Sequence, residues 1–130
     1  MNIKDSILEA NDTKIEVEDV PEWNCKVGIK VMTGTERDNF ELSLYSEKGK
    51  TQKENLLNLR SRLLVKVIVD PETKKRVFKD KEAVDLGRKS SIVIDRLYAL
   101  AQEINGLRKQ DIEELTKNSE ETQSEESILD

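Results

Sequence analysis

Carboxylates are the commonest groups in this chain that could do chemistry. Two sets stand out: the adjacent pair Glu113 and Glu114, and the cluster Glu36, Asp38 and Glu41. Paired acids can hold Mg²⁺ or act together as an acid and a base. Both sets fall on expected exposed helix faces with bases nearby, a pattern typical of solvated surface. We therefore predict neither a catalytic site nor a metal site there.

Other catalytic and ligand residues are scarce. The 130 residues include no histidine and one cysteine, Cys25, which excludes Cys/His zinc sites and histidine-activated nucleophiles. A single cysteine also forms no disulfide within the chain, as expected for a reducing cytosolic compartment. Neither GxxxxGK[ST] nor GxGxxG is present, and Gly34 and Gly87 fall at expected helix boundaries. We predict a protein without enzyme activity and without a cofactor.

The negative charge is concentrated at one end. The chain has 27 acids and 22 bases, and residues 119–130 hold five acids and no base, so residues 1–118 are neutral. A neutral body argues against broad nucleic-acid binding. The tail consists mainly of residues that cannot build a core, and we expect it to be disordered. No apolar run reaches the roughly 18 residues of a membrane span, and no secretory h-region is visible.

A β-hairpin is the first large element expected along the chain. Residues 14–20 and 25–32 alternate apolar and polar side chains, and Pro21 opens the interruption between them. A short helix over residues 5–10, capped by Asp5, is expected before it. Two strands alone are marginally stable, so helices must cover their apolar face.

The helices follow the hairpin. Thr33 and Glu36 have the spacing of a capping box, which predicts a helix that carries Phe40 and Leu44 on one face and ends near Gly49. Residues 55–69 have the spacing of a core helix, although the β-branched end, residues 65–70, is also compatible with an extended conformation.

Turn and cap signals divide the rest of the chain. Asp70 to Thr73 form an expected β-turn, and residues 76–78 form a short strand or an extended loop. We then expect three helices: Asp80 to Leu86 closed by a left-handed Gly87, a long one from Ser90 or Ser91 to Asn105-Gly106, and residues 109–117. The prediction is one compact α+β domain over residues 1–118, a β-hairpin packed on about four helices, followed by a disordered acidic tail over 119–130.

Three features of the sequence allow two interpretations each. Trp23 in the hairpin turn covers the core or anchors an interface. A run of bases around the second turn is a solvated tip or meets an acidic partner: Lys74, Lys75, Arg76, Lys79 and Lys81. Ile128 and Leu129 belong to an inert tail or to a short linear motif that folds on a partner.

The order of these motifs resembles the tail assembly chaperones of long-tailed phages and prophages. The likeness begins at residues 17–41, VEDVPEWNCKVGIKVMTGTERDNFE, and continues through residues 54–107 and 112–118. In the first stretch the matching residues are Pro21, Glu22, Trp23, Thr33, Gly34, Glu36, Arg37, Asp38, Phe40 and Glu41. In the second they are Arg60, Arg62, Leu63, Leu64, Phe78, Leu86, Gly87, Lys89, Ser90, Asp95, Arg96, Leu97, Ala101, Asn105, Gly106 and Leu107. The NCK sequence after Trp23 departs from the family pattern.

The resemblance implies a non-catalytic protein of the host cell cytoplasm that is absent from the mature virion. Such proteins bind the tape measure protein, keep it soluble and recruit tail tube protein, and many have a frameshifted longer form. Self-association is compatible with this role. The implied partner-binding residues are those of the first stretch: Trp23, Thr33, Gly34, Glu36, Arg37, Asp38, Phe40 and Glu41. We expect the helices that carry Phe40 and residues 56–68, with the lip at Trp23, to offer apolar faces, and residues 92–104 to form the central core.

A regulatory DNA-binding module is the competing hypothesis. Short helices after a hairpin are compatible with a winged helix-turn-helix, in which residues 74–81 would be the wing. The neutral body and the acidic tail oppose that hypothesis.

Overall fold

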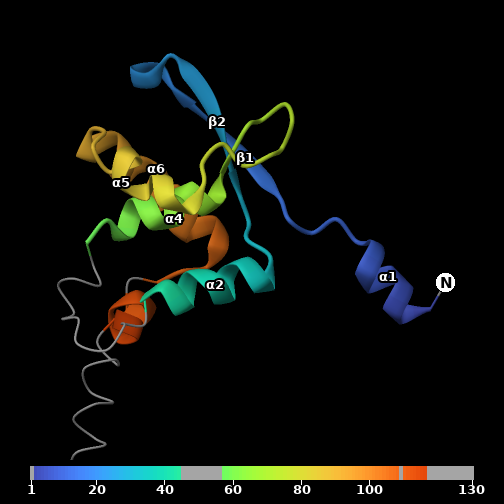
Figure 1. Cartoon of the computed structure of the whole chain (residues 1–130). Helices are drawn as coiled ribbons and strands as arrows, with labels where there is room; N and C mark the ends of the chain where they lie inside the picture. Colours follow the sequence, from blue (N-terminus) through green and yellow to red (C-terminus); the bar gives the residue numbers. More distant parts are fainter. Residues whose placement is uncertain (1, 45–56, 109, 117–130) are drawn as a thin grey trace, which may run out of the picture.

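The computed structural model describes residues 2–44, 57–108 and 110–116 (Figure 1). The first half contains α1 (Ile3–Glu9), β1 (Ile15–Val20), the 3₁₀ turn η1 (Pro21–Trp23), β2 (Cys25–Lys30) and α2 (Gly34–Leu44). The second half contains α4 (Leu59–Val67), β3 (Ile68–Val69), η2 (Asp80–Glu82), α5 (Ala83–Leu86) and α6 (Ser91–Asn105). Residues 110–116 form a further helix.

The three strands form one antiparallel sheet in the order β1-β2-β3. The hairpin register runs from Ile15 opposite Lys30 to Val20 opposite Cys25, which confirms the predicted hairpin. β3 continues directly from α4 and pairs with Gly28 and Ile29 of β2. Residues 65–70 were compatible with a helix or with an extended conformation. In the structure residues 65–67 are helical, and Ile68–Val69 are extended. The α+β fold class is confirmed.

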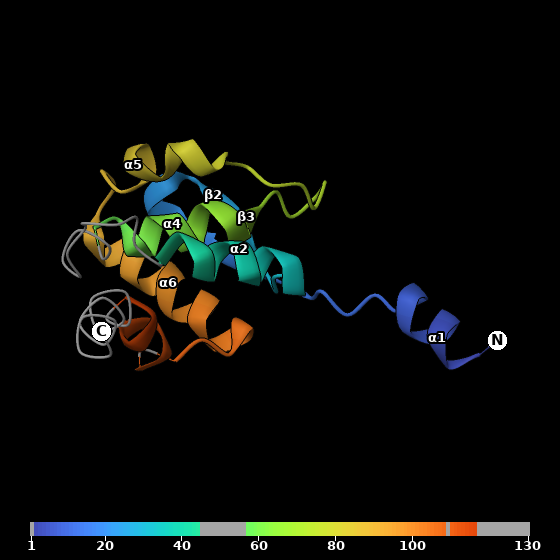
Figure 2. The ribbon, with the colours of Figure 1, turned by 60° about the horizontal axis from the view of Figure 1, so that its bottom comes forward.

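One face of the sheet is covered by helices. α4 and α6 pack against each other and both contact β2 (Figures 1 and 2). The side chains of Val27 and Ile29 join the helix residues Leu63 and Leu97 in a single hydrophobic cluster. Phe40 and Leu44 of α2 are also fully buried in it, so the predicted apolar face of that helix is confirmed. Trp23 is half-buried and packs against the same cluster.

Several predicted caps are confirmed. Ser90 is the N-cap of α6, and its Oγ accepts a hydrogen bond from the amide of Ile92 at 3.3 Å. Gly106 ends α6 in the left-handed conformation, with φ at 62°. Asp70 organises the predicted turn, because its Oδ1 accepts from the amide of Glu72 at 2.8 Å. That turn is one residue wider than predicted, since the amide of Lys74 donates to the carbonyl of Asp70.

Three predicted boundary residues have other roles. Asn2 rather than Asp5 caps α1, because Asn2 Oδ1 accepts from the amide of Asp5 at 2.8 Å. Asp80 lies inside η2, and Glu82 accepts from the amide of Lys79 instead. Gly87 is right-handed, with φ at −63°, so the left-handed prediction is wrong. Its small size matters for packing, since a Cβ there would lie 2.7 Å from Asn58 Oδ1.

Some predictions fall outside the described residues. These are the end of the Phe40 helix near Gly49, the start of the core helix at residues 55–56, and the tail over residues 119–130. Within the part of the chain that the structure describes, no helix is long and apolar enough to cross a bilayer.

Candidate partner-binding surfaces

The junction between β2 and α2 has the predicted capping box. The backbone amide of Glu36 donates to Thr33 Oγ1 at 3.1 Å, and the amide of Thr33 donates to Glu36 Oε1 at 2.9 Å. These two bonds satisfy amides that the first helical turn would otherwise leave without partners. Thr33 and Glu36 therefore have a structural role at the start of α2.

Glu36 also joins α2 to the sheet. Its second carboxylate oxygen accepts from the ammonium group of Lys30, the last residue of β2. Partial burial raises the pKa of Glu36, but the hydrogen bonds from Lys30 and Thr33 outweigh it, so the pKa lies below its ordinary value. The carboxylate is therefore ionised at neutral pH, and each of its two oxygens accepts a hydrogen bond.

Arg37 connects α2 to the end of α6. Its Nε donates to Glu41 Oε1 at 3.1 Å, one turn along α2. Its Nη1 donates to the backbone carbonyl of Asn105, also at 3.1 Å. Arg37 and Glu41, chosen as motif residues, thus stabilise the packing of two helices that are distant in sequence.

Asn105 is the residue at this junction that sequence reasoning missed as a tertiary contact. Its Oδ1 accepts from the amide of Met32 at 2.7 Å, and its Nδ2 donates to the carbonyls of Lys30 and Ala101. The sequence signals were its place at the predicted end of a helix, where asparagine is common for local reasons, and its match to the family pattern, and neither predicts a contact with β2. Its actual partners lie at the end of β2.

The remaining motif residues do not form one exposed patch. Asp38 and Gly34 are exposed, and a Cβ on Gly34 would meet nothing within 4 Å. Phe40 has no exposed surface at all. The structure therefore brings Thr33, Glu36, Arg37 and Glu41 together at a structural junction and buries Phe40 beneath it.

The predicted apolar docking faces on two helices are largely buried, although Leu57 is 70% exposed and Leu59 is half-buried at the start of the second one. Phe40, Leu63, Leu64 and Val67 are each 0% exposed, because the sheet, α6 and the two helices themselves cover them. Ile92, assigned to the central core, is instead 76% exposed at the start of α6. Amphipathic spacing identified which faces are apolar, but both helices use those faces for the core of this chain.

A second long-range contact fixes the hairpin tip to α6. Both guanidinium Nη atoms of Arg96 donate to the two carboxylate oxygens of Glu22, at 2.7 and 3.0 Å. The hydrogen bonds from Arg96 lower the pKa of Glu22 to about 2. This fork geometry is the strongest form of an arginine–carboxylate pair, although both side chains remain partly exposed.

The basic run around the second turn is partly neutralised within the chain. Arg76 donates to the carbonyl of Val65 at 2.8 and 3.1 Å and to Asp80 at 2.7 Å. Lys66 also reaches Asp80, at 3.3 Å. Arg76 therefore connects the loop to α4. The lysines of the run are exposed: Lys74, Lys75, Lys79 and Lys81.

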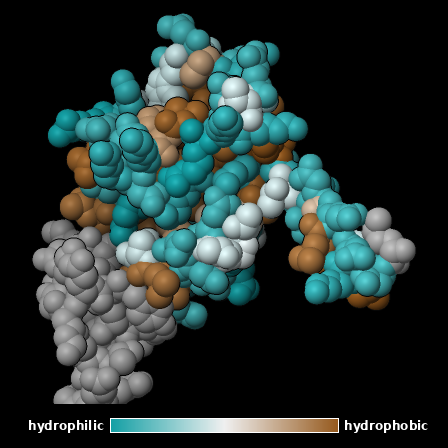
Figure 3. Space-filling view, turned by 45° about the vertical axis from the view of Figure 1, so that its right-hand side comes forward, coloured by the Kyte–Doolittle hydropathy of each residue, from teal (hydrophilic) through white to brown (hydrophobic). Residues whose placement is uncertain are grey.

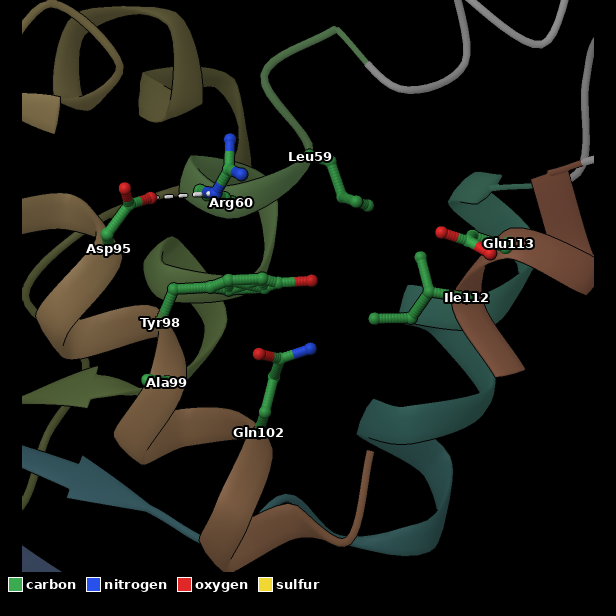
Figure 4. Close-up of a pocket in the computed structure, with 8 residues that line it drawn as sticks. All are labelled: Leu59, Arg60, Asp95, Tyr98, Ala99, Gln102, Ile112 and Glu113. Atoms are coloured by element: carbon green, nitrogen blue, oxygen red, sulfur yellow. Dashed lines mark ion pairs between the residues drawn. The ribbon is translucent and has the colours of Figure 1, made fainter. Parts of the chain in front are cut away.

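A groove of about 450 Å³ lies between the start of α4, α6 and the helix over residues 110–116 (Figure 4). Its lining residues are Leu59, Arg60, Asp95, Tyr98, Ala99, Gln102, Ile112 and Glu113. Figure 4 shows Leu59, Tyr98 and Ile112 directed toward the same space from three different elements. The groove therefore has an apolar centre that the sequence did not reveal, because its walls are distant in the chain.

Polar groups form one wall of the groove. Arg60 pairs with Asp95 at 2.8 Å, and its guanidinium carbon lies 5.8 Å from the ring centroid of Tyr98. Burial raises the pKa of Tyr98, so its hydroxyl is neutral and can donate a hydrogen bond. An apolar centre bounded by charged and amide side chains suits one face of an amphipathic helix.

Metal-ligand groups and cysteine were the remaining candidates for chemistry in this chain. Across residues 2–44, 57–108 and 110–116, no cluster of three or more acids, histidines or cysteines could hold a metal ion. The only cysteine, Cys25, is exposed and unpaired at the start of β2. The groove at Tyr98 and Ile112 is therefore considered as a candidate binding site on its shape and lining.

Comparisons with known proteins point the same way. A sequence model of a family described as phage tail assembly chaperone matches residues 2–124. No curated protein sequence matches the chain. A solved structure titled "Structure of bacteriophage HK97 tail assembly chaperone" is similar with a TM-score of 0.54 and 20% identity. That match covers 77% of this chain and 90% of the other, and at this identity it shows the shared fold alone.

Proposed function

Because this chain belongs to the phage tail assembly chaperone family, we propose that it binds a phage tape measure protein and keeps it soluble until tail tube protein assembles around it. The family match over residues 2–124 is the observation that carries this proposal. The protein acts without catalysis, in the host cell cytoplasm, and is absent from the finished virion.

The groove between α4, α6 and the helix over residues 110–116 supplies the binding site in this proposal. A tape measure protein is rich in long apolar helices, and a helix laid in a groove buries one face while its other face stays in water. Leu59, Tyr98 and Ile112 would cover apolar side chains of that helix. Leu57, two residues before Leu59, is 70% exposed and adds apolar surface near the start of α4.

The rim of the groove adds selectivity without much affinity. Arg60 and Asp95 already satisfy each other, so a bound helix with polar flanks can share these groups without leaving a charge buried alone. Glu113 lies on the opposite wall (Figure 4). Because the apolar centre provides the attraction and the rim charges of Arg60 and Asp95 neutralise each other, the tape measure segment can be released when tube protein competes for it.

Co-expression tests the function and the site together. The tape measure protein should become soluble and co-purify with the wild-type chain. Ala99→Arg places a long charged side chain in the groove at an exposed position of α6, so co-purification should fall steeply. Asn39→Arg adds the same charge at an exposed position of α2 outside the groove and should have no effect.

The outcomes separate the function from its site. No gain in tape measure solubility and no co-purification with the wild-type chain would defeat the proposed function. Equal binding by the wild-type, Ala99→Arg and Asn39→Arg chains would retain the function and rule out the groove. In the DNA-binding alternative, Arg76 of the supposed wing is engaged with Val65 and Asp80, so it is not free to contact DNA.

A further inference from the structure

The groove between α4, α6 and the helix over residues 110–116 has one charge that no described residue neutralises. Of its three charged lining residues, Arg60 and Asp95 pair with each other at 2.8 Å. The third, Glu113, is exposed and has no ion-pair partner among the described residues. It lies on the wall opposite Arg60 and Asp95 (Figure 4). The groove therefore presents an apolar centre with a free carboxylate on one side.

The helix that forms this wall is acidic as a whole. Residues 110–116 contain Asp111, Glu113 and Glu114 and no base. Arg108, just before the helix, donates to the two carboxylate oxygens of Asp111, both at 3.1 Å. That pair leaves Glu113 and Glu114 as the exposed acids of the wall.

The net charge of the chain divides at the same helix. Residues 110–130 contain eight acids and one base, a net charge of −7, whereas residues 1–109 contain 19 acids and 21 bases, a net charge of +2. The excess negative charge therefore belongs to the segment that begins at this wall of the groove. Such a charge attracts cations over roughly a Debye length, about 8 Å at physiological ionic strength.

This distribution of charge discriminates among occupants of the groove. The chain's own residues 119–130 are disfavoured, because they carry five acids and no base and the free charge of the groove is also negative. A helix with glutamates beside its apolar stripe is disfavoured for the same reason. A helix with lysine or arginine at those positions gains from Glu113 directly and from the other acids at longer range.

We propose that the groove selects an amphipathic helix of the tape measure protein with lysine or arginine along one side of its apolar stripe, an inference that rests on the function proposed above. The stripe packs on Leu59, Tyr98 and Ile112, and the basic side faces Glu113. Arg60 and Asp95 neutralise each other on the opposite wall, so charge recognises one side of the helix only. Exposed ion pairs add little affinity each, so the acids mainly speed association and select among helices.

Three synthetic helical peptides with the same apolar stripe test this selection. One has lysine along one side of the stripe, one has glutamine there and one has glutamate, and fluorescence anisotropy measures their dissociation constants with the purified full chain. At low salt the lysine peptide should bind on the order of tenfold more tightly than the glutamine peptide, and the glutamate peptide should bind most weakly. The differences should shrink as salt is added, because ions screen the charges.

Ala99→Arg shows whether the peptides occupy the groove. Exposed hydrophobic residues also lie elsewhere, and Figure 3 shows hydrophobic patches on both the N-terminal arm and the body. Ala99 is an exposed lining residue of the groove, so a long charged side chain there should weaken the binding of all three peptides.

Glu113→Lys locates the charge selection. It should lower the affinity for the lysine peptide about fivefold or more and raise the affinity for the glutamate peptide. Glu72→Lys is the matched control, because it makes the same change of charge at an exposed position of the turn after β3, outside the lining of the groove. It should change both affinities far less. Glu113→Gln should have an intermediate effect and takes the place of Glu113→Lys if that variant fails to fold.

Three results would overturn the proposal. One is a wild-type chain that binds the lysine and glutamate peptides equally, or binds neither. Another is a lysine preference that Glu72→Lys reduces as much as Glu113→Lys does, which would make it an effect of net charge alone. The last is a preference that Glu113→Lys leaves unchanged but that disappears when Glu120, Glu121, Glu125 and Glu126 are replaced by glutamine, which would assign the selection to the tail.

The tape measure protein separates this inference from the function on which it rests. Co-purification that Ala99→Arg abolishes and Glu113→Lys leaves unchanged would retain the proposed function and overturn the charge selection. No co-purification with the wild-type chain would defeat the proposed function, whereas the peptide affinities would still decide whether the groove prefers a basic helix.

Discussion

Asn105, the last residue of α6, accepts a hydrogen bond from the backbone amide of Met32, 73 residues earlier in the chain, at 2.7 Å. The same side chain donates to the carbonyl of Lys30 at 3.2 Å. One amide group therefore satisfies both a donor and an acceptor where β2 ends. It holds α2, β2 and α6 in register.

Asn105→Ala should lower the free energy of unfolding by roughly 1–3 kcal/mol, because it leaves partly buried backbone groups without partners. Urea titration at neutral pH measures the change. Asn39→Ala is the control, since Asn39 is exposed on α2. Equal stability of the two variants would mean that water replaces the Asn105 amide without cost.

Thr33→Ala should destabilise the protein by about 1 kcal/mol through loss of the N-cap of α2. Thr35→Ala changes the same atoms two residues later, at an exposed position inside the helix, and should cost little. Thermal unfolding of both variants gives the comparison. If Thr35→Ala were as costly as Thr33→Ala, the capping box would not explain the motif.

The Glu22–Arg96 pair should contribute a pH-dependent part of the stability. Hydrogen bonds from Arg96 lower the pKa of Glu22 from 4.5 to about 2 in the folded state. A lowered carboxyl pKa stabilises the fold above the unfolded value, so the contribution is complete above pH 4.5 and is lost as pH falls toward 2.

Glu22→Gln tests this pH dependence. The difference in unfolding free energy between the wild-type and Glu22→Gln chains should be constant near neutral pH and shrink between pH 4.5 and 2. Glu16→Gln changes an exposed acid on β1 and serves as the control. A difference that stays constant down to pH 2 would contradict the pairing.

Gly28 and Gly34 should respond oppositely to alanine. Gly28→Ala should lower the unfolding free energy by roughly 1–3 kcal/mol, because its Cβ would meet the side chain and carbonyl of Val69. Gly34→Ala should leave stability unchanged or raise it by up to about 1 kcal/mol, since nothing lies within 4 Å and the helix gains a better former. Denaturant titration of both variants checks the pair. A loss of tape measure binding by a stable Gly34→Ala chain would show that this motif residue contacts the partner.

The sequence by itself determined the local elements and the family. Alternation in residues 14–32 predicted the hairpin, and Thr33, Ser90 and Gly106 predicted helix ends, because each signal depends on hydrogen bonds within a few residues. The same locality explains the errors at Asp5, Asp80 and Gly87, where neighbouring residues satisfy the helix end in another way.

Only the tertiary structure decided which apolar surfaces remain available. Helical spacing showed that Phe40 and Leu63 lie on apolar faces, but not that the sheet and α6 would cover those faces completely. The groove at Tyr98 and Ile112 and the Asn105 contact each combine residues that are distant in the chain. Their positions follow from how the layers pack, which no short stretch of sequence encodes alone.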